Sequence, residues 1–198
     1  MAAIDYVSSG ARAVLVQELR RHALVIGEVT LTSGATALYL VDAKRAILRP
    51  AGFRALAQLV AAEVGVRGAT AVGGLTMGAD PIACAALAGM SSDGAGDALK
   101  AFFVRKDRKT HGLQRTIEGP LLEPGERCLI VEDVVTTGGS ARRAIEAVIE
   151  EGHEVCGGVA VLDRRAGGAE AIERAAQAPF VALTTIDDVY PQRPDRAE

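Results

Sequence analysis

Hydrophobic and polar positions in the N-terminal part of the chain follow two different rhythms. Apolar residues in the segment 10–25 recur at helical spacing, which predicts an amphipathic helix. The segment 27–47 instead alternates apolar and polar positions around a Ser-Gly pair, which predicts two antiparallel strands. Pro50 then begins a second helical pattern, for which Gly65 is placed as the stop.

From residue 69 the pattern changes to short apolar runs separated by helical stretches. The predicted strands are residues 69–74, 101–106, 127–133, 154–164 and 180–188, and the predicted helices are residues 79–90, 140–152 and 167–177. Strands that are apolar on both faces and alternate with helices indicate a mostly parallel central sheet covered on two sides. The predicted fold class is therefore α/β.

We expect a single domain over residues 1–198. Residues from about 66 to 198 would form the parallel core, and residues 1 to about 65 would supply helices and a small hood of antiparallel strands. The chain is 49% hydrophobic and 24% charged with a net charge of −3, which is a globular composition that does not favour nucleic-acid binding. The apolar runs are too short for a membrane span, and the N-terminus lacks a signal-peptide pattern, so a cytoplasmic location is expected.

The three cysteines are widely spaced and odd in number. Cys84, Cys128 and Cys156 form no Cys-x-x-Cys pair, so neither a disulfide framework nor a zinc site is indicated. We expect all three to be buried, reduced thiols that pack as small hydrophobic side chains.

Two adjacent carboxylates, Glu132 and Asp133, stand between a buried apolar run and a turn rich in threonine and glycine. Gly138 and Gly139 allow the backbone to approach a ligand closely, and a helix predicted to begin with Ser140 as its N-cap adds free N–H groups. The turn suits a monophosphate, although it is neither a Walker A nor a Gly-x-Gly-x-x-Gly sequence. Carboxylates accept hydrogen bonds from hydroxyl groups, so the whole pattern suits a ribose 5-phosphate. The plain alternative is a strand–turn–helix junction without a ligand.

The stretch "LIVEDVVTTGGS" resembles the phosphoribosyl-diphosphate (PRPP) signature of the type I phosphoribosyltransferases. The resemblance implies the type I phosphoribosyltransferase fold, with Glu132 and Asp133 on the ribose hydroxyls and Asp133 among the catalytic residues. It implies that the 5-phosphate is bound by the residues Val134, Val135, Thr136, Thr137, Gly138, Gly139 and Ser140. It also implies Mg²⁺ as cofactor, held through PRPP with no direct protein ligand and with a water-mediated contact to Asp133.

Four further stretches resemble the orotate-using branch of this family. They are "LTSGATALYLVDAKR", "VGGLTMGADPIA", "FFVRKDRKTHG" and "VLDRRAGG", in the family's order. The resemblance implies that Thr136 and Arg164 bind orotate; an ion pair of Arg164 with Asp163 is the alternative. It implies transfer of ribose 5-phosphate from PRPP to orotate, giving orotidine 5′-phosphate and diphosphate. The sequence departs from part of the family at Thr32, Leu40, Val41 and Gly78, which concerns base binding. Asp42 and Lys44 keep the family's Asp-x-basic pattern, which implies a contribution of Lys44 to the site.

A run of cations lies in the third of these stretches. A charge run is usually a solvated surface, but beside a phosphoribosyl site its cations would stabilise a departing diphosphate. By resemblance, Arg105, Lys106, Lys109 and His111 contact the diphosphate, and Lys109 and His111 are catalytic. The resemblance further implies a homodimer in which the loop 105–112 serves the neighbouring subunit's site. Two alternatives stay open: a phosphoribosyltransferase for another base, and a PRPP-binding regulator of nucleotide genes on the same fold.

Overall fold

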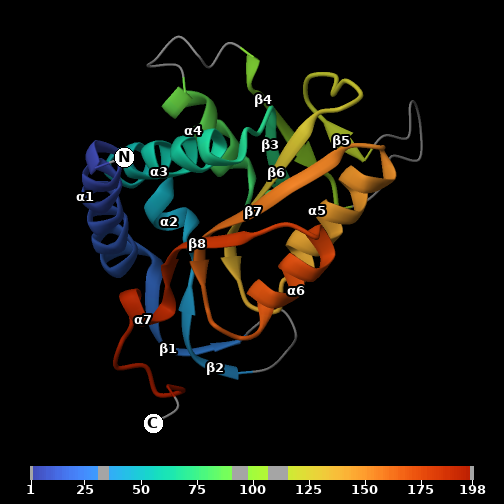
Figure 1. The fold of residues 1–198 in the computed structure, drawn as a ribbon. Coiled ribbons are helices and arrows are strands. Elements are labelled where there is room, and N and C mark those ends of the chain that lie inside the picture. The colour runs from blue at the N-terminus through green and yellow to red at the C-terminus, as the bar shows by residue number, and fades with distance from the viewer. Residues whose placement is uncertain (1, 31–35, 91–97, 107–115, 197–198) are drawn as a thin grey trace.

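The computed structural model describes residues 2–30, 36–90, 98–106 and 116–196. Its centre is a six-stranded sheet in the order β5–β4–β3–β6–β7–β8, and β1 and β2 form a separate antiparallel hairpin (Figure 1). The pairings β3–β4, β3–β6, β6–β7 and β7–β8 are parallel, whereas β4–β5 is antiparallel. The predicted α/β class, with a mostly parallel sheet and a small antiparallel unit, is confirmed.

The strands are β1 (Leu24–Thr30), β2 (Thr36–Val41), β3 (Ala71–Leu75), β4 (Lys100–Val104), β5 (Ile117–Glu118), β6 (Arg127–Val135), β7 (Glu154–Asp163) and β8 (Phe180–Thr185). The helices are α1 (Ala2–Glu18), the π-helical turn η1 (Leu19–Ala23), α2 (Lys44–Ile47), α3 (Pro50–Arg67), α4 (Asp80–Met90), α5 (Gly139–Glu150), α6 (Gly168–Ala176) and α7 (Ile186–Val189).

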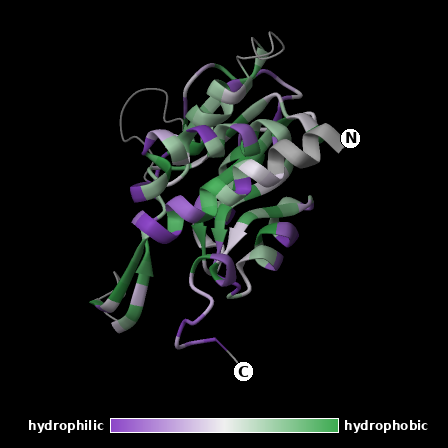
Figure 2. Cartoon of the chain, turned by 90° about the vertical axis from the view of Figure 1, so that its left-hand side faces the viewer, coloured by the Kyte–Doolittle hydropathy of each residue, from purple (hydrophilic) through white to green (hydrophobic). Residues whose placement is uncertain are grey.

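Helices cover both faces of the sheet, and strand β6 shows why. Leu129 and Val131 belong to a buried cluster with α1, α3 and α4, whereas Cys128 and Ile130 belong to a second cluster with α5 and α6. Side chains alternate between the two faces of a strand, so an uninterrupted apolar run fills both clusters at once. Figure 2 shows the result, with hydrophobic strands at the centre and polar positions concentrated on the surrounding helices.

The structure corrects two predicted boundaries in the N-terminal part. The first helical segment begins earlier than residue 10 and ends at Ala23, because Leu24 already pairs with Val41 in the hairpin. The predicted stop at Gly65 is wrong, since α3 continues to Arg67 and Gly68 ends it in the left-handed region at φ 57°. A glycine adopts that conformation without the steric cost of a Cβ atom, which is why it terminates the helix.

Two more corrections concern the C-terminal half. The N-cap of α5 is Gly138, not Ser140, because Gly138 takes a left-handed conformation (φ 78°) and the helix already begins at Gly139. The predicted strand 180–188 is too long. It ends at Thr185, whose side chain forms a capping box with Asp188 and so starts α7.

The cysteine prediction is partly wrong. All three are free thiols, and Cys128 and Cys156 are buried, but Cys84 is exposed on α4. Burial raises the pKa of Cys128 to about 12, which keeps that thiol protonated. Within the described ranges, no helix is both long and apolar enough to cross a membrane.

Candidate active site

The acid pair lies near the carboxyl end of β6, the edge of a parallel sheet where ligands bind in open α/β folds. Glu132 and Asp133 are only 7% and 8% exposed. Their carboxylates converge on Gly78, which follows β3: a Cβ atom there would lie 2.6 Å from Asp133 Oδ1 and 3.0 Å from Glu132 Oε1. The two acids therefore share one confined space, and the absence of a side chain at Gly78 keeps that space open.

Lys44, on the short helix α2, supplies a cation to this pair. Its Nζ lies 2.8 Å from Asp133 Oδ2 and 3.1 Å from Asp42 Oδ1. Burial alone would lower the pKa of Lys44, but the hydrogen bond and charge of Asp133, followed by those of Asp42, raise it. The lysine thus stays protonated and offsets the negative charge of Asp133.

Glu132 lacks such a partner. Its Oε2 is buried without a hydrogen bond, while its Oε1 accepts from the Asp133 N–H at 3.3 Å. Burial, reinforced by the adjacent Asp133, raises the pKa of Glu132 to about 8. A buried carboxylate oxygen without a donor is costly, so this atom is suited to accept hydrogen bonds from a ligand's hydroxyl groups.

Directly after the acids the chain forms a hollow, here called the cradle. It is lined by Glu132 and by the residues Val134, Val135, Thr136, Thr137, Gly138, Gly139 and Ser140. The cradle leads into α5, whose first backbone N–H groups have no partner within the helix and suit an anion. The sequence prediction placed the acids and the Thr/Gly turn side by side, and the structure does the same.

The cradle is braced from behind by α6. A Cβ atom at Gly138 would lie 2.9 Å from the carbonyl oxygen of Gly168, and one at Gly168 would lie 2.6 Å from the carbonyl oxygen of Thr136. Two glycines therefore let two backbone segments touch, and the turn is held by packing as well as by its own conformation.

Arg164 lies beside the cradle, one residue beyond the end of β7. Its backbone N–H donates to the carbonyl of Val135 at 2.9 Å, and its side chain is 20% exposed. The guanidinium donates to the Tyr39 hydroxyl at 3.0 Å, and its carbon lies 5.0 Å from the centre of the Tyr39 ring. The alternative pairing with Asp163 is not what the structure records: Asp163 Oδ1 accepts from the backbone of Arg165, and the recorded ion pair of Arg164 is with Asp195 at 3.9 Å.

Two of the predicted diphosphate ligands are described. Arg105 and Lys106 follow β4 and are exposed at the same edge of the sheet as the cradle. Arg105 forms a 3.4 Å ion pair with Glu118, and the carbonyl of Lys106 accepts a hydrogen bond from Arg143 on α5. Lys109 and His111 lie outside the described residues.

The structure brings three further residues to this edge: Lys44, for which a contribution to the site was expected, and Tyr39 and Asp195, for which none was. Lys44 and Tyr39 both lie in the stretch "LTSGATALYLVDAKR", which resembles the family, whereas Asp195 belongs to no recognised motif. Their contacts join segments far apart in the chain, so local patterns contain little information on them.

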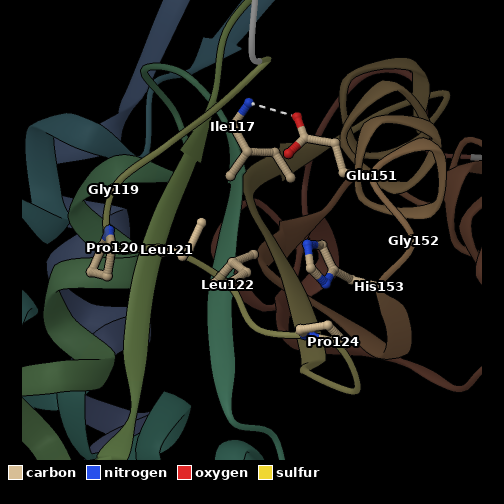
Figure 3. A pocket seen from close by; sticks show the side chains of 9 residues that line it. All are labelled: Ile117, Gly119, Pro120, Leu121, Leu122, Pro124, Glu151, Gly152 and His153. Carbon is tan, nitrogen blue, oxygen red and sulfur yellow. Dashed lines mark hydrogen bonds between the residues drawn. The ribbon is translucent and has the colours of Figure 1, made fainter. Parts of the chain in front are cut away.

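Another hollow lies at the opposite edge of the sheet, where β6 and β7 begin (Figure 3). It is lined by Ile117, Gly119, Pro120, Leu121, Leu122, Pro124, Glu151, Gly152 and His153. Glu151 Oε1 accepts a hydrogen bond from the Ile117 N–H at 3.3 Å. Among the described residues that line it there is no serine or threonine, whereas the cradle has three. It therefore lacks the hydroxyl groups that line the cradle.

Comparison with known proteins agrees with this geometry. Residues 46–177 match the family model of the phosphoribosyl transferase domain. The chain is 46% identical over 169 residues to an orotate phosphoribosyltransferase of Streptomyces avermitilis, covering 85% of this chain and 91% of the relative. It is 43% identical over 183 residues to that of Corynebacterium glutamicum, covering 92% and 96%.

Solved structures give the same result. An orotate phosphoribosyltransferase of Mycobacterium tuberculosis, in complex with Fe(III) dicitrate, aligns with a TM-score of 0.78 at 41% identity, covering 91% of this chain and 99% of that one. A structure of the M. tuberculosis enzyme in complex with PRPP aligns with a TM-score of 0.71 at 34% identity, covering 91% and 92%. The chain therefore belongs to the phosphoribosyltransferase family and, within it, to the orotate phosphoribosyltransferases.

Proposed function

We propose that this chain transfers the ribose 5-phosphate group of PRPP to orotate, forming orotidine 5′-phosphate and diphosphate in pyrimidine synthesis. One observation carries the proposal: the acid pair and cradle end β6, and Arg164 follows the adjacent strand β7, hydrogen-bonded to β6 through Val135. A sugar-phosphate site and a cation for an acidic base thus lie side by side.

PRPP would bind at the end of β6. The cradle donates hydrogen bonds to the 5-phosphate from its backbone and hydroxyl groups, and Glu132 and Asp133 accept hydrogen bonds from the ribose hydroxyls. The unpartnered Oε2 of Glu132 supports this assignment. Arg105 and Lys106, together with Lys109 and His111, would contact the diphosphate.

Orotate would bind at the end of β7, with its carboxylate on Arg164 and a further contact to Thr136. A guanidinium offers parallel N–H groups that match a planar carboxylate, which a lysine cannot do. The partial burial of the Arg164 side chain supports a role in binding rather than in solvation.

The chemistry needs no protein nucleophile. Orotate N1 forms a bond to C1 of the ribose, while the C1–oxygen bond to diphosphate breaks and its electron pair leaves with the diphosphate. The proton lost from N1 passes to the departing diphosphate. The oxocarbenium-like transition state carries positive charge on the sugar, and the departing group gains negative charge. Lys109, which we propose is catalytic together with His111 and Asp133, would stabilise that negative charge.

Mg²⁺ is the proposed cofactor. The residues present fit it, because the carboxylates of Glu132 and Asp133 offer the oxygen atoms that Mg²⁺ prefers, at the edge where the ribose hydroxyls would lie. Asp133 already pairs with one cation, the ammonium group of Lys44. Bound Mg²⁺ would neutralise the charge of the diphosphate and help to position PRPP. Asp133 would contact it through water, and the protein's own contribution is to orient the hydroxyls.

We further propose a single domain, a homodimer and a cytoplasmic location. The single domain is supported by the buried cluster that α1 and α3 share with the sheet. The homodimer, in which the loop 105–112 completes the neighbouring site, follows from the family resemblance of that loop. The location is supported by the free thiols of Cys84, Cys128 and Cys156, which fit a reducing compartment.

The test is an ultraviolet assay of orotate consumption with PRPP and Mg²⁺, run in parallel with uracil, hypoxanthine and adenine. We expect turnover of orotate only. Turnover of another base in place of orotate would indicate a different phosphoribosyltransferase. If no base is consumed by the folded protein although PRPP binds, the chain would be a PRPP-binding regulator.

A further inference from the structure

The C-terminal segment 190–196 folds back onto the orotate end of the site. Tyr190 packs edge-on against Tyr39, with ring centres 5.4 Å apart and an interplanar angle of 81°. Arg193 pairs with Asp187 on α7, and its Nε lies 3.3 Å from Asp195 Oδ1. An aromatic contact and two ion pairs therefore determine where the carboxylate of Asp195 lies.

Asp195 ends a short polar chain that begins at Arg164. The Arg164 guanidinium donates to the Tyr39 hydroxyl, and that hydroxyl lies 3.0 and 3.2 Å from the two carboxylate oxygens of Asp195. Asp195 Oδ2 lies 3.9 Å from Arg164 Nη2. The cation that would hold the orotate carboxylate thus already faces a carboxylate of its own chain.

The three residues differ in how freely they can move. Tyr39 is 3% exposed and the Arg164 side chain is 20% exposed, whereas the side chain of Asp195 is 55% exposed. A half-exposed carboxylate regains water easily when it leaves, while a largely buried guanidinium needs an anionic partner. In an exchange of partners, Asp195 is therefore the residue that moves.

The contact between Asp195 and Arg164 is also loose. Charge-assisted hydrogen bonds between guanidinium and carboxylate are typically about 2.7–2.9 Å long and often bidentate. An incoming planar carboxylate can reach that geometry and displace an ion pair whose separation is 3.9 Å.

We propose that Asp195 occupies, in the substrate-free protein, the place on Arg164 and Tyr39 that the carboxylate of orotate takes, so that the C-terminal segment and the base compete for it. The inference rests on the proposed function. Asp195 is then a residue that sets the affinity for the base without touching the reacting atoms. Tyr39 is a positioning residue, because its ring and hydroxyl orient the guanidinium. Its O–H group donates a hydrogen bond to Asp195 in the free protein and to the substrate carboxylate in the complex.

The first test is the substitution Asp195→Asn, with Glu170→Gln as a control that removes one charge from an exposed position on α6. We expect the KM for orotate and the Kd for orotidine 5′-phosphate to fall about 2- to 5-fold, the effect of losing one exposed competing ion pair. The value of kcat and the KM for PRPP should remain unchanged, and the control should behave as wild type. A higher KM for orotate would mean that Asp195 supports Arg164, and an unchanged KM would mean that it has no influence; either result overturns the inference.

The second test compares two nucleotides that differ by one carboxylate, orotidine 5′-phosphate and uridine 5′-phosphate. Hydrogen exchange of the backbone amides in residues 190–196 of the wild-type protein should quicken with the first and not with the second. Equal effects of the two nucleotides, or protection by orotidine 5′-phosphate, would overturn the inference while leaving the proposed function intact. Failure of the proposed function would be seen differently, as absent orotate turnover in the wild-type protein.

Discussion

Lys44 Nζ lies 2.8 Å from Asp133 Oδ2 although the two residues are 89 positions apart in the chain. A helix of the N-terminal part thus reaches the acid pair at the end of β6 and places a fixed cation on it. Because Asp133 is almost completely buried, its ion pair with Lys44 should stabilise the fold as well as hold the acid pair in place.

Replacing Lys44 by methionine should lower the free energy of unfolding by about 1–3 kcal/mol, because a buried carboxylate would lose its charged partner. Urea unfolding measures this. The control is Arg45→Met, an exposed neighbour on the same helix, which we expect to change stability by less than about 0.5 kcal/mol. Equal effects of the two changes would contradict the assignment.

Glu132 should make stability depend on pH. Burial and the adjacent Asp133 raise its pKa from 4.5 to about 8 in the folded protein, so between these values the folded state binds more protons than the unfolded state. The free energy of unfolding should therefore fall as pH rises through this window, by at most about 1.4 kcal/mol per pH unit. Glu132→Gln, which mimics the protonated acid, should flatten the profile. A wild-type profile that is already flat between these pH values would show that the shift is absent.

PRPP binding should release a proton from the same residue. Ribose hydroxyls and Mg²⁺ favour the ionised carboxylate, so the ligand lowers the pKa of Glu132 and its affinity should rise between about pH 6 and 8. Calorimetry in buffers of different ionisation enthalpy detects the released proton. An affinity independent of pH in this range would place Glu132 outside the ribose site.

Gly78→Ala should weaken PRPP binding. The added methyl group would lie 2.6 Å from Asp133 Oδ1 and 2.9 Å from its Cγ, so the acid pair must shift. We expect a loss of at least about tenfold in PRPP affinity, as for other changes that displace a buried polar group. Gly65→Ala is the matched control, because a Cβ atom there meets nothing within 4 Å and should stabilise α3 slightly. If both variants bind PRPP like wild type, Gly78 has no role in keeping the acids in place.

Arg164→Lys should separate the two substrates. The lysine keeps the charge but loses the paired N–H groups, so the KM for orotate should rise about tenfold or more while the KM for PRPP changes less than about twofold. Arg165→Lys, at the exposed neighbour that pairs with Asp187, should alter neither. An increase confined to the KM for PRPP would mean that Arg164 binds PRPP and not orotate.

A mixing experiment tests whether each site is shared between two subunits. Lys109→Ala should lower turnover more than PRPP binding, and Asp133→Asn should weaken PRPP binding. If the loop 105–112 serves the neighbouring subunit, co-expressed chains carrying one change each form mixed dimers with one intact site. Activity should then return to about a quarter of wild type. Activity no higher than the average of the two variants would argue against sharing.

The parts of the site that a reader of the sequence could foresee are those coded by neighbouring residues. The apolar run before Glu132 predicts a buried strand, and the Thr/Gly turn after it predicts an anion site, because backbone and side chains of one short stretch build both. The start of α7 was also visible in principle, since Thr185 and Asp188 have the spacing of a capping box.

The remainder depends on contacts between distant segments. Nothing in the stretch around Asp133 indicates that Lys44 would reach it, and nothing near Arg164 points to Tyr39 or Asp195. These pairings follow from how the hairpin and the C-terminal segment pack against the sheet. Even the end of α3 needed tertiary information, because Gly65 and Gly68 are equally good candidates by residue type.

The close packing of Gly138 against Gly168 has a consequence for affinity. Because α6 supports the cradle from behind, the cradle holds its shape before any ligand arrives. Little conformational entropy then remains to be lost when a phosphate binds, and more of the interaction free energy appears as affinity. A larger residue at either position would separate the two segments, and every phosphorylated ligand would bind more weakly whatever base it carried.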